Sequence, residues 1–579
     1  MLRKIRKIDF LPEFFMWLYF GIIFIILALI FFLGDRTEFY AKRELLLSHK
    51  MMVVISAIVT VLICFFNKLL LKKERASEGS EEPLQDGCLG SLKNHRSFLE
   101  KWEKPILVLI LGLLFIAQLV LVNSAFFFSD WDPSGILSAA HEIANGRHEE
   151  VSIDYFSAHP NNLVIVWIYA GILRLYGIFH QIGYYGSPSV MWIVYLQCLL
   201  FTISGYLVYR ISRDLTNSVG IGFFTLLYYV MFIGLSPWII ITYSDAAGLI
   251  FPLLILRLYQ RDKNGTIEID GRAPLGQKRI CNWCLIGFLS RFGYAIKPQI
   301  LIVFIAVLII EILGLREIRS SLKEKLIGSA LGILIGSLLI SVFIIPSTGL
   351  KLQKSKAFGM AHYLMMGLNQ KTDGVYDNDD TNFTNSIEDP AERRRTNLQV
   401  AAERAQEFGL LGLCRHLYRK TLVNFCDGTF AFGINGNFFA GELSGKENRL
   451  TPFLRSVIYT DGENFRLYAT IMGILWYTIL LSSLLPALMI FHKDLKNEMT
   501  AEANSRERQR AMIHGVICLS LIGIFVFEIL FEALARYLFI YSPVWLLAAS
   551  SGWRKAASFL NLRLSAIESP LGVSQDKLQ

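Results

Sequence analysis

Long apolar stretches alternate with short polar or charged stretches along most of the chain. A helix needs about 20 apolar residues to cross the hydrocarbon core of a bilayer, and many of these stretches reach that length. None shows the alternation of apolar and polar residues that is typical of a transmembrane β-strand. The pattern therefore predicts an all-α polytopic membrane protein with about twelve transmembrane helices. The predicted helices cover residues 14–33, 51–71, 104–127, 188–210, 219–241, 245–259, 281–296, 299–315, 325–346, 468–491, 511–531 and 537–552.

Composition and charge support the same class of protein. The 579 residues are 53% hydrophobic and 18% charged, which is typical of a multispanning membrane protein. A net charge of +9 can also indicate binding to nucleic acid. The Lys and Arg residues, however, gather at the ends of the predicted helices and in alternate loops, as the positive-inside rule requires. We therefore expect the lipid bilayer, and no nucleic acid, as a partner.

The basic loops also predict an orientation in the plasma membrane, with the N- and C-termini in the cytoplasm. One loop disagrees, because four basic residues between the first two predicted helices fall on the outer side: Arg36, Lys42, Arg43 and Lys50. Either that hairpin dips into the membrane without crossing, or the later charges dominate. The orientation after residue 104 is the same in both cases. The basic inner segments are 72–75, 210–213, 261–279, 316–325, 493–510 and the tail.

The hydrophobic pattern divides the chain into successive parts. Between the spans lie two longer outer regions, and the second contains a Gly- and aromatic-rich run at 427–433. Because this second region is too long for a simple connector, we expect it to fold over the membrane surface. The predicted parts are an accessory transmembrane hairpin (1–71), a cytoplasmic linker (72–103), a transmembrane core (104–346) with a catalytic outer loop (128–187), an extracytoplasmic loop domain (347–467), the last transmembrane helices (468–552) and a cytoplasmic tail (553–579).

The cysteines give little sign of a metal site or a disulfide framework. Cys281 and Cys284 form a single CxxC pair at the start of an apolar span, with no second pair to complete a zinc site. Cys414 and Cys426 fall in the same outer region. They can form a disulfide or remain free thiols, because nothing in the sequence fixes their distance.

The first outer loop opens with two carboxylates at the end of a predicted span, Asp130 and Asp132. Asp132 precedes Pro133 and a run with helical spacing that stops at Gly146, so Asp132 can simply be the N-cap of a surface helix. Asp130 has no such structural role, and we predict that it acts as a general base. The alternative is a solvated loop carboxylate.

Three further polar motifs interrupt apolar sequence on the same predicted side. Asp245 lies in a Tyr-Ser-Asp triplet, Lys297 precedes a proline, and Arg536 precedes a tyrosine at the last span. A charged group between spans is costly unless it faces water or a charged partner, and phosphate is a suitable partner for Lys and Arg. The alternatives are an N-cap role for Asp245 and a snorkelling side chain for Lys297.

The order and sidedness of these motifs resemble the GT-C superfamily of polytopic glycosyltransferases, which includes protein mannosyltransferases and aminoarabinose transferases. The resemblance covers roughly residues 104–315 and 511–552 and says little about 370–467. The chain departs from the family pattern because two extra spans precede the acidic loop.

The resemblance implies a role for each candidate residue. Asp130 is the expected catalytic base, and a divalent cation (Mg or Mn) is the cofactor candidate, held by Asp130 and Asp245. The remaining candidates are the acceptor or metal residues Asp132, Asp245 and His159, the donor phosphate-binding residues Lys297, Arg536 and His362, and the supporting residues Tyr243, Glu532 and Tyr537.

The predicted function is the transfer of a monosaccharide, with inversion, from a polyprenyl-phosphate carrier to an extracytoplasmic acceptor. The acceptor is a cell-envelope glycan, a teichoic acid or a protein. One alternative is a transporter or flippase of a lipid-linked sugar, but that function favours inverted repeats, and the sequence shows none. A second alternative is a membrane scaffold, which leaves the gathering of acids and bases on one side unexplained.

Overall fold

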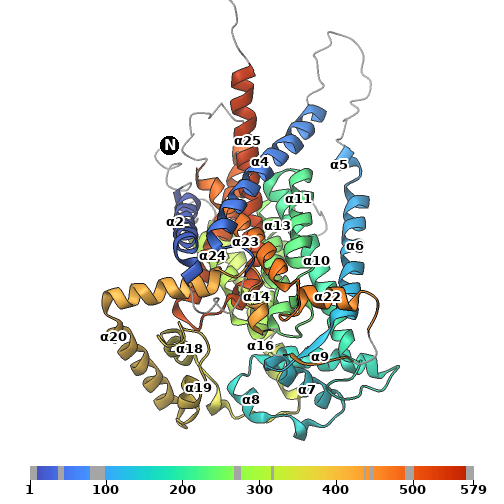
Figure 1. The fold of residues 1–579 in the computed structure, drawn as a ribbon, viewed down its shortest axis with the longest axis vertical. Coiled ribbons are helices and arrows are strands. Elements are labelled where there is room, and N and C mark those ends of the chain that lie inside the picture. The colour runs from blue at the N-terminus through green and yellow to red at the C-terminus, as the bar shows by residue number, and fades with distance from the viewer. Residues whose placement is uncertain are drawn as a thin grey trace, which may run out of the picture.

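The computed structural model describes residues 10–36, 45–78, 98–265, 275–313, 319–435, 439–443, 447–488 and 501–568. Within these ranges the protein is helical apart from one two-stranded sheet, which confirms the all-α polytopic class (Figure 1). Seven of the described helices are long and apolar enough to cross a membrane, and three shorter apolar helices lie among them. The twelve predicted segments are helical over most of their length, while the number that crosses the bilayer stays a prediction.

The long helices that meet the length and apolarity of a span form the upper part of the molecule in Figure 1. Their apolar character all round is expected for helices that face lipid on one side and protein on the other. They are α2 (Phe10–Leu33), α4 (His49–Glu78), α6 (Glu103–Ala125), α10 (Val190–Thr216), α16 (Arg319–Leu338) with η6 (Leu339–Ile344), α23 (Phe465–Leu488) and α24 (Ala501–Leu530).

Further helices, of various lengths, complete the bundle around these spans. Several are interrupted by turns at the end where the predicted site residues lie. They are α5 (Phe98–Lys101), α11 (Val219–Tyr229), η3 (Val230–Gly234), η4 (Pro237–Ile239), α12 (Ser244–Gly248), α13 (Ile250–Lys263), α14 (Leu275–Ile296), η5 (Pro298–Ile300), α15 (Leu301–Leu313), η9 (Ala535–Tyr541) and α25 (Ser542–Glu568).

The connecting regions form a second layer below the bundle in Figure 1, which we call the loop layer. It consists of segments from both outer regions of the sequence. Its elements are β1 (Phe127–Ser129), α7 (Asp132–Ala144), η2 (His148–Glu150), α8 (Ile153–Ala158), α9 (Asn162–Gly177), α17 (Ile345–Ser347), η7 (Lys354–Lys356), α18 (Met360–Gly367), α19 (Asn378–Asn385), α20 (Pro390–Phe425), α21 (Phe432–Asn435), β2 (Phe439–Glu442) and α22 (Thr451–Ile458).

The two outer regions are joined by the small sheet. Strand β1 pairs antiparallel with β2, with Phe127 opposite Glu442 and Phe128 opposite Gly441. A bulge follows Phe128 and lets the chain turn into α7. The large region 347–467 therefore does not stand apart, because its backbone is hydrogen-bonded to the first outer loop.

The end of the bundle opposite the loop layer holds a network of buried ion pairs. Lys263 at the end of α13 and Lys325 on α16 both pair with Glu311 on α15. Arg279 on α14 pairs with Glu324 at 2.8 Å. Residues from two of the basic segments, 261–279 and 316–325, thus meet at one end of the bundle, while the side of the membrane on which they lie stays a prediction.

A stripe of glycines allows close packing of α14 against α16. Gly328, Gly332 and Gly336 are spaced by four residues and face α14. A Cβ atom at Gly332 would lie 1.9 Å from the carbonyl oxygen of Cys284, so no other residue fits there. Small residues at this spacing are typical of helices that approach closely in membranes.

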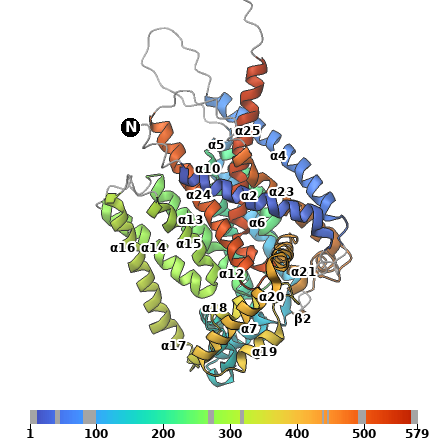
Figure 2. The ribbon, with the colours of Figure 1, turned by 90° about the vertical axis from the view of Figure 1, so that its left-hand side faces the viewer.

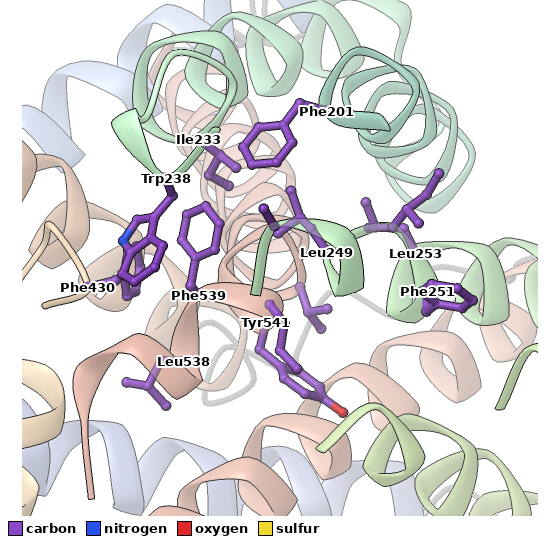
Figure 3. Packing of buried hydrophobic residues seen from close by; sticks show 14 of the residues in the cluster. Phe201, Ile233, Trp238, Leu249, Phe251, Leu253, Phe430, Leu538, Phe539 and Tyr541 are labelled. Carbon is purple, nitrogen blue, oxygen red and sulfur yellow. The ribbon is translucent and has the colours of Figure 1, made fainter. Parts of the chain in front are cut away.

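The aromatic run at 427–433 is buried inside the helix bundle. The sequence instead predicts that this region folds over the membrane surface. Figure 3 shows Phe430 beside Trp238 and Phe539 in the apolar core. The Phe430 ring lies 5.6 Å from that of Phe539, and the Trp238 indole donates to the carbonyl of Thr429. Aromatic residues bury large apolar areas, so this run fills space inside the bundle and is not a surface connector. We call residues 427–433 the plug.

Two strained residues shape this plug. Phe430 and Ala431 have φ angles of 56° and 61°, a conformation that non-glycine residues rarely adopt. The Asp427 carboxylate accepts hydrogen bonds from the backbone N–H groups of Thr429 (2.8 Å) and Ala431 (2.9 Å). These bonds replace the backbone partners that a regular helix or strand would supply and hold the turn in place.

The predicted N-terminal hairpin packs on the C-terminal spans. Helices α2 and α4 contact α23, and Figure 2 shows α2 lying across α24 and α23. The Tyr19 hydroxyl donates to Ser483 at 2.8 Å, and the His49 imidazole is 2.7 Å from the Tyr477 hydroxyl. Most of the predicted linker, at 79–97, and the last residues of the tail lie outside the described residues.

The disulfide considered from the sequence does not form. Cys414 is exposed on α20 and Cys426 is buried at its end, and both thiols are free. A helix separates the two side chains by about three turns, which is far beyond disulfide reach.

Candidate functional site

Helix ends bring the predicted charged residues together at the loop-layer end of the bundle. Asp245 lies in the short helix α12 before α13, and Lys297 follows the last residue of α14. Arg536 lies in η9, directly before α25. Residues separated by almost 300 positions in the sequence therefore share one place. We call the group Trp131, Asp132, Tyr243, Asp245, Lys297, Arg536 and Tyr537 the site cluster.

A buried ion pair forms the base of the site cluster. The Lys297 ammonium is hydrogen-bonded to Oδ1 of Asp245, and Arg536 Nε lies 3.9 Å from Oδ2. Lys297 is 4% exposed, Asp245 is 0% exposed and Arg536 is 7% exposed. Burial of charges is costly even when they are paired, and here the single Asp245 carboxylate is shared between two cations.

Aromatic rings surround the two cations. The Arg536 guanidinium carbon lies 4.4 Å from the centre of the Trp131 ring, 5.4 Å from Tyr243 and 5.1 Å from Tyr537. Lys297 Nζ lies 4.9 Å from the Tyr537 ring. The faces of these rings attract cations and fix their direction without neutralising them.

The Arg536 guanidinium has few hydrogen-bond partners. Among the described residues it makes one long bond, from Nη2 to the Tyr537 hydroxyl at 3.4 Å, and its Nε has no acceptor. A guanidinium carries five N–H donors in a planar fork that matches a carboxylate or phosphate. The unused donors of the buried Arg536 side chain are thus of a kind that suits an anion.

Asp132 faces the same cluster and is not the N-cap of its helix. Helix α7 begins at Asp132, Trp131 occupies the cap position, and no side chain makes the capping bond. The N-cap reading of Asp132 is therefore wrong. Its Oδ2 instead accepts a hydrogen bond from the Tyr243 hydroxyl at 2.8 Å. The same holds for Asp245, because the cap position of α12 is Tyr243 and Lys297 binds the Asp245 carboxylate.

Asp130 makes no ion pair with the cluster among the described residues. It is exposed at the end of β1, and the structure gives it no hydrogen bond with the described residues. Its charge acts on Tyr185, which is not part of the site cluster. The charge of Asp132, in contrast, acts on both Arg536 and Tyr243. The geometry thus makes Asp132, and not Asp130, the carboxylate nearest to the cations.

An aromatic rim extends the cluster toward the loop layer. The His159 ring lies 5.2 Å from both Tyr155 and Phe358, and the His362 ring lies 4.4 Å from Phe358. Asn162 donates to the Tyr155 hydroxyl at 2.8 Å, which fixes the tyrosine beside Asp132. The rim combines residues from both outer regions of the sequence. Strands β1 and β2 join the same two regions.

The two histidines of the rim are neutral. Burial lowers the pKa of His362 to about 4 and also lowers the pKa of His159. His362 Nδ1 is 2.8 Å from the Thr384 hydroxyl. A neutral imidazole at pH 7 supplies a hydrogen bond but no permanent charge, so His362 is a weak candidate for the predicted phosphate contact.

Glu532 supports Tyr537 instead of pairing with Arg536. The Tyr537 hydroxyl donates to Oε1 of Glu532 at 2.8 Å. This bond orients the ring against which both Lys297 and Arg536 rest. Glu532 therefore acts on the cations through Tyr537, whereas its spacing in the sequence indicates a direct contact with Arg536.

Three aromatic residues of this site were not among the predicted site residues: Trp131, Tyr155 and Tyr363. Trp131 lies between the two predicted carboxylates, and that position was its only signal in the sequence. The charges of both Glu532 and Asp132 act on the Tyr363 hydroxyl, so this residue lies near the cluster. Burial raises the pKa of Tyr363, so this hydroxyl stays protonated.

The residues do not fit the predicted divalent cation. Among the described residues, no group of three or more His, Cys, Asp or Glu side chains converges on one point. Asp245 already faces Lys297 and Arg536, and these two positive charges would repel a further cation. Asp130 is exposed, whereas Asp245 is buried and bound to Lys297, so these two carboxylates lie in different surroundings.

Comparison with known sequences gives a family. Residues 92–557 match the family described as conserved hypothetical integral membrane protein. The chain belongs to this family. The family match begins after α2 and α4 and contains every residue of the site cluster. No curated protein matches the chain.

Proposed function

We propose that this family member is a glycosyltransferase that moves a monosaccharide from a polyprenyl-phosphate carrier to an acceptor in the cell envelope. The observation that carries the proposal is the buried Arg536 guanidinium, which has unused donors beside Lys297 and opposite the Asp132 carboxylate. An anion-binding pair facing a base suits the transfer of a group away from phosphate. The resemblance of the motifs to GT-C enzymes points the same way.

In the proposed reaction Asp132 acts as the general base. It takes the proton of an acceptor hydroxyl as the oxygen attacks the anomeric carbon of the donor sugar. The bond between that carbon and the phosphate oxygen breaks, and the electron pair leaves with the phosphate. Attack from the face opposite the phosphate inverts the configuration at this carbon.

Lys297 and Arg536 stabilise the leaving group. The phosphate gains negative charge as it departs, and the two cations meet this charge at the base of the cluster. The Tyr243 hydroxyl donates to Asp132 and holds the base at a fixed angle. The proposal places the cluster on the extracytoplasmic face of the plasma membrane and requires no divalent cation.

The test compares Asp132→Asn with Asp130→Asn in the native host at matched protein levels. Polyprenyl-phosphate sugars and envelope glycans are measured by mass spectrometry. We expect Asp132→Asn to accumulate one lipid-linked sugar and to lower transfer at least about 100-fold, because a general base contributes that much. Asp130→Asn should leave both pools unchanged.

Other outcomes reject parts of the proposal. Loss of transfer in Asp130→Asn alone would return the base to Asp130. Unchanged pools in Asp132→Asn, Lys297→Ala and Arg536→Ala would reject the transferase. Lipid-linked sugar trapped on the inner leaflet would indicate a flippase instead.

A further inference from the structure

Helix α20 is two helices joined at a break. Gly409 has φ 55° and ψ −178°, a combination that only glycine adopts without strain. A Cβ atom there would meet no neighbour within 4 Å, so packing does not demand the glycine. The glycine is required by the backbone conformation at the break. Residues 390–408 form the first half of α20, and residues 410–425 form the second half, which runs at an angle to the first.

The exposed side chains change character at this break. In the first half they are mostly polar or charged, and Leu398 is the large apolar exception at 41% exposed. Directly after Gly409, Leu410 and Leu411 are 80% and 86% exposed, the highest values among the large apolar residues of the described chain. Exposed apolar side chains of this size need a partner.

The second half lies where the bilayer boundary is expected. Figure 1 shows it crossing the long axis of the molecule, along which α6 and α25 run. It also contacts α2 and α24, two helices with the length and apolarity of spans. A helix perpendicular to the spans, at their end, runs in the plane of the membrane surface.

The inner end of this half-helix is fixed to the bundle. Lys420 is buried and donates to the carbonyl oxygens of Gly367 at 2.8 Å and Ile529 at 2.9 Å. The His416 imidazole also lies 2.9 Å from the Gly367 carbonyl. Because the inner end is held, the outer end with its two leucines projects sideways from the protein in a defined direction.

We propose that residues 410–425 are a membrane-interface anchor whose tip, Leu410 and Leu411, inserts into the leaflet on the side of the loop layer. The exposed Arg415 lies one turn further along and suits the lipid phosphates at the same boundary. The first half of α20, with its charged surface, then stands in water. This inference is independent of the proposed glycosyltransferase activity.

The test measures the depth of a nitroxide label on purified full-length protein in vesicles of phosphatidylcholine and phosphatidylglycerol. The background replaces Cys88, Cys281, Cys284 and Cys414 by serine, so that labelling is confined to the introduced site. Leu411→Cys carries the label at the tip. Gln406→Cys is the matched control, because it is exposed on the same helix before the break.

We expect the label at position 411 to collide with oxygen and to be protected from a water-soluble nickel chelate. The label at 406 should show the reverse. Equal exposure of both labels to the nickel chelate would overturn the proposal and would assign the two leucines to a protein partner. If Leu411→Cys prevents folding, Leu410→Cys supplies the same measurement.

Discussion

At the scale of single residues, the site cluster depends on charges that are held apart from water by aromatic rings. The Arg536 guanidinium rests against Trp131 and Tyr537 and keeps donors unused. Lysine offers a point charge and no planar fork, so the two cations of the cluster are not interchangeable. Arginine is the residue whose replacement is most informative.

Replacement of Arg536 by lysine should weaken binding of a polyprenyl phosphate about tenfold or more, because the two-pronged contact and the ring stacking are lost together. The affinity of purified protein in nanodiscs for the phosphate carrier measures this effect. Arg449→Lys, at an exposed position, is the matched control. Equal affinities for the two variants would contradict the assignment of Arg536 to phosphate.

The rim histidine His362 predicts a dependence of stability on pH. Burial lowers the pKa of its imidazole to about 4 from 6.5, so the unfolded chain binds more protons between these values. The free energy of unfolding should therefore fall as the pH drops from about 6.5 to 4, by up to about 1.4 kcal/mol per pH unit from this group. In His362→Gln the difference between the unfolding temperatures at pH 7 and pH 4.5 should shrink. An unchanged difference would show that His362 is accessible and titrates normally.

Sequence alone predicted that Asp245, Lys297 and Arg536 lie on the same side of the bundle, but not their contacts with one another. Asp245, Lys297 and Arg536 were found because a charge between apolar spans is costly and needs a reason. Asp130 was preferred to Asp132 because Asp-Pro at a helix start is typical of a cap. The structure instead gives Asp132 a hydrogen bond from Tyr243, which is 111 residues away in the sequence, and no local pattern encodes that contact.

At the scale of elements, the close contact of α14 and α16 depends on glycines. The carbonyl of Cys284 occupies the place where a side chain at Gly332 would begin. Such a contact forces the helices apart if any atom is added, because neither backbone can move alone. Gly112 on α6 has no neighbour within 4 Å of its missing Cβ and provides a contrast.

We expect Gly332→Val to lower the free energy of unfolding by about 1–3 kcal/mol, the usual cost of overpacking. Gly112→Val should change it by much less, since the added atoms face open space. Unfolding followed in detergent micelles by intrinsic fluorescence compares the two variants. Similar losses in both would mean that valine acts through helix propensity and not through the contact.

The plug at 427–433 gives a second test at this scale. Asp427→Ala removes the acceptor for the backbone N–H groups of Thr429 and Ala431 and leaves them buried. We expect destabilisation by about 2–3 kcal/mol, with Asp461→Ala, at an exposed position, as the control. A neutral effect of Asp427→Ala in thermal unfolding would show that the strained turn holds without its side-chain bonds. The sequence did not predict this plug, because Gly next to aromatic residues is equally typical of a surface loop.

At the scale of the whole molecule, the N-terminal hairpin packs on a core of helices. The family match covers this core but not the hairpin. The family match begins at residue 92, yet α2 packs on α23 and α24, and α4 packs on α23. Tyr19 and His49 form hydrogen bonds with Ser483 and Tyr477 on α23. The pattern of apolar residues predicted helices α2 and α4, and both are long and apolar enough to cross a membrane. It could not predict their neighbours, since every lipid-facing helix is apolar all round.

A chain that starts at residue 92 should therefore accumulate less and unfold at a lower temperature than the full chain, because apolar faces of α23 and α24 lose their partners. Fluorescence-detected gel filtration after heating measures both quantities. If the shortened chain matches the full one, the hairpin contributes nothing to the stability of the core.

The position of Phe430 also bears on how the protein is made. Its ring contacts Phe232, Trp476 and Phe539, which leave the ribosome at very different times. Helices α6 to α16 must enter the membrane while the space for this ring is still empty. The set of contacts around Phe430 is complete only once Phe539 has been translated. A nascent chain that stalls before that point displays an unfilled apolar gap, the kind of surface that membrane quality-control proteases remove.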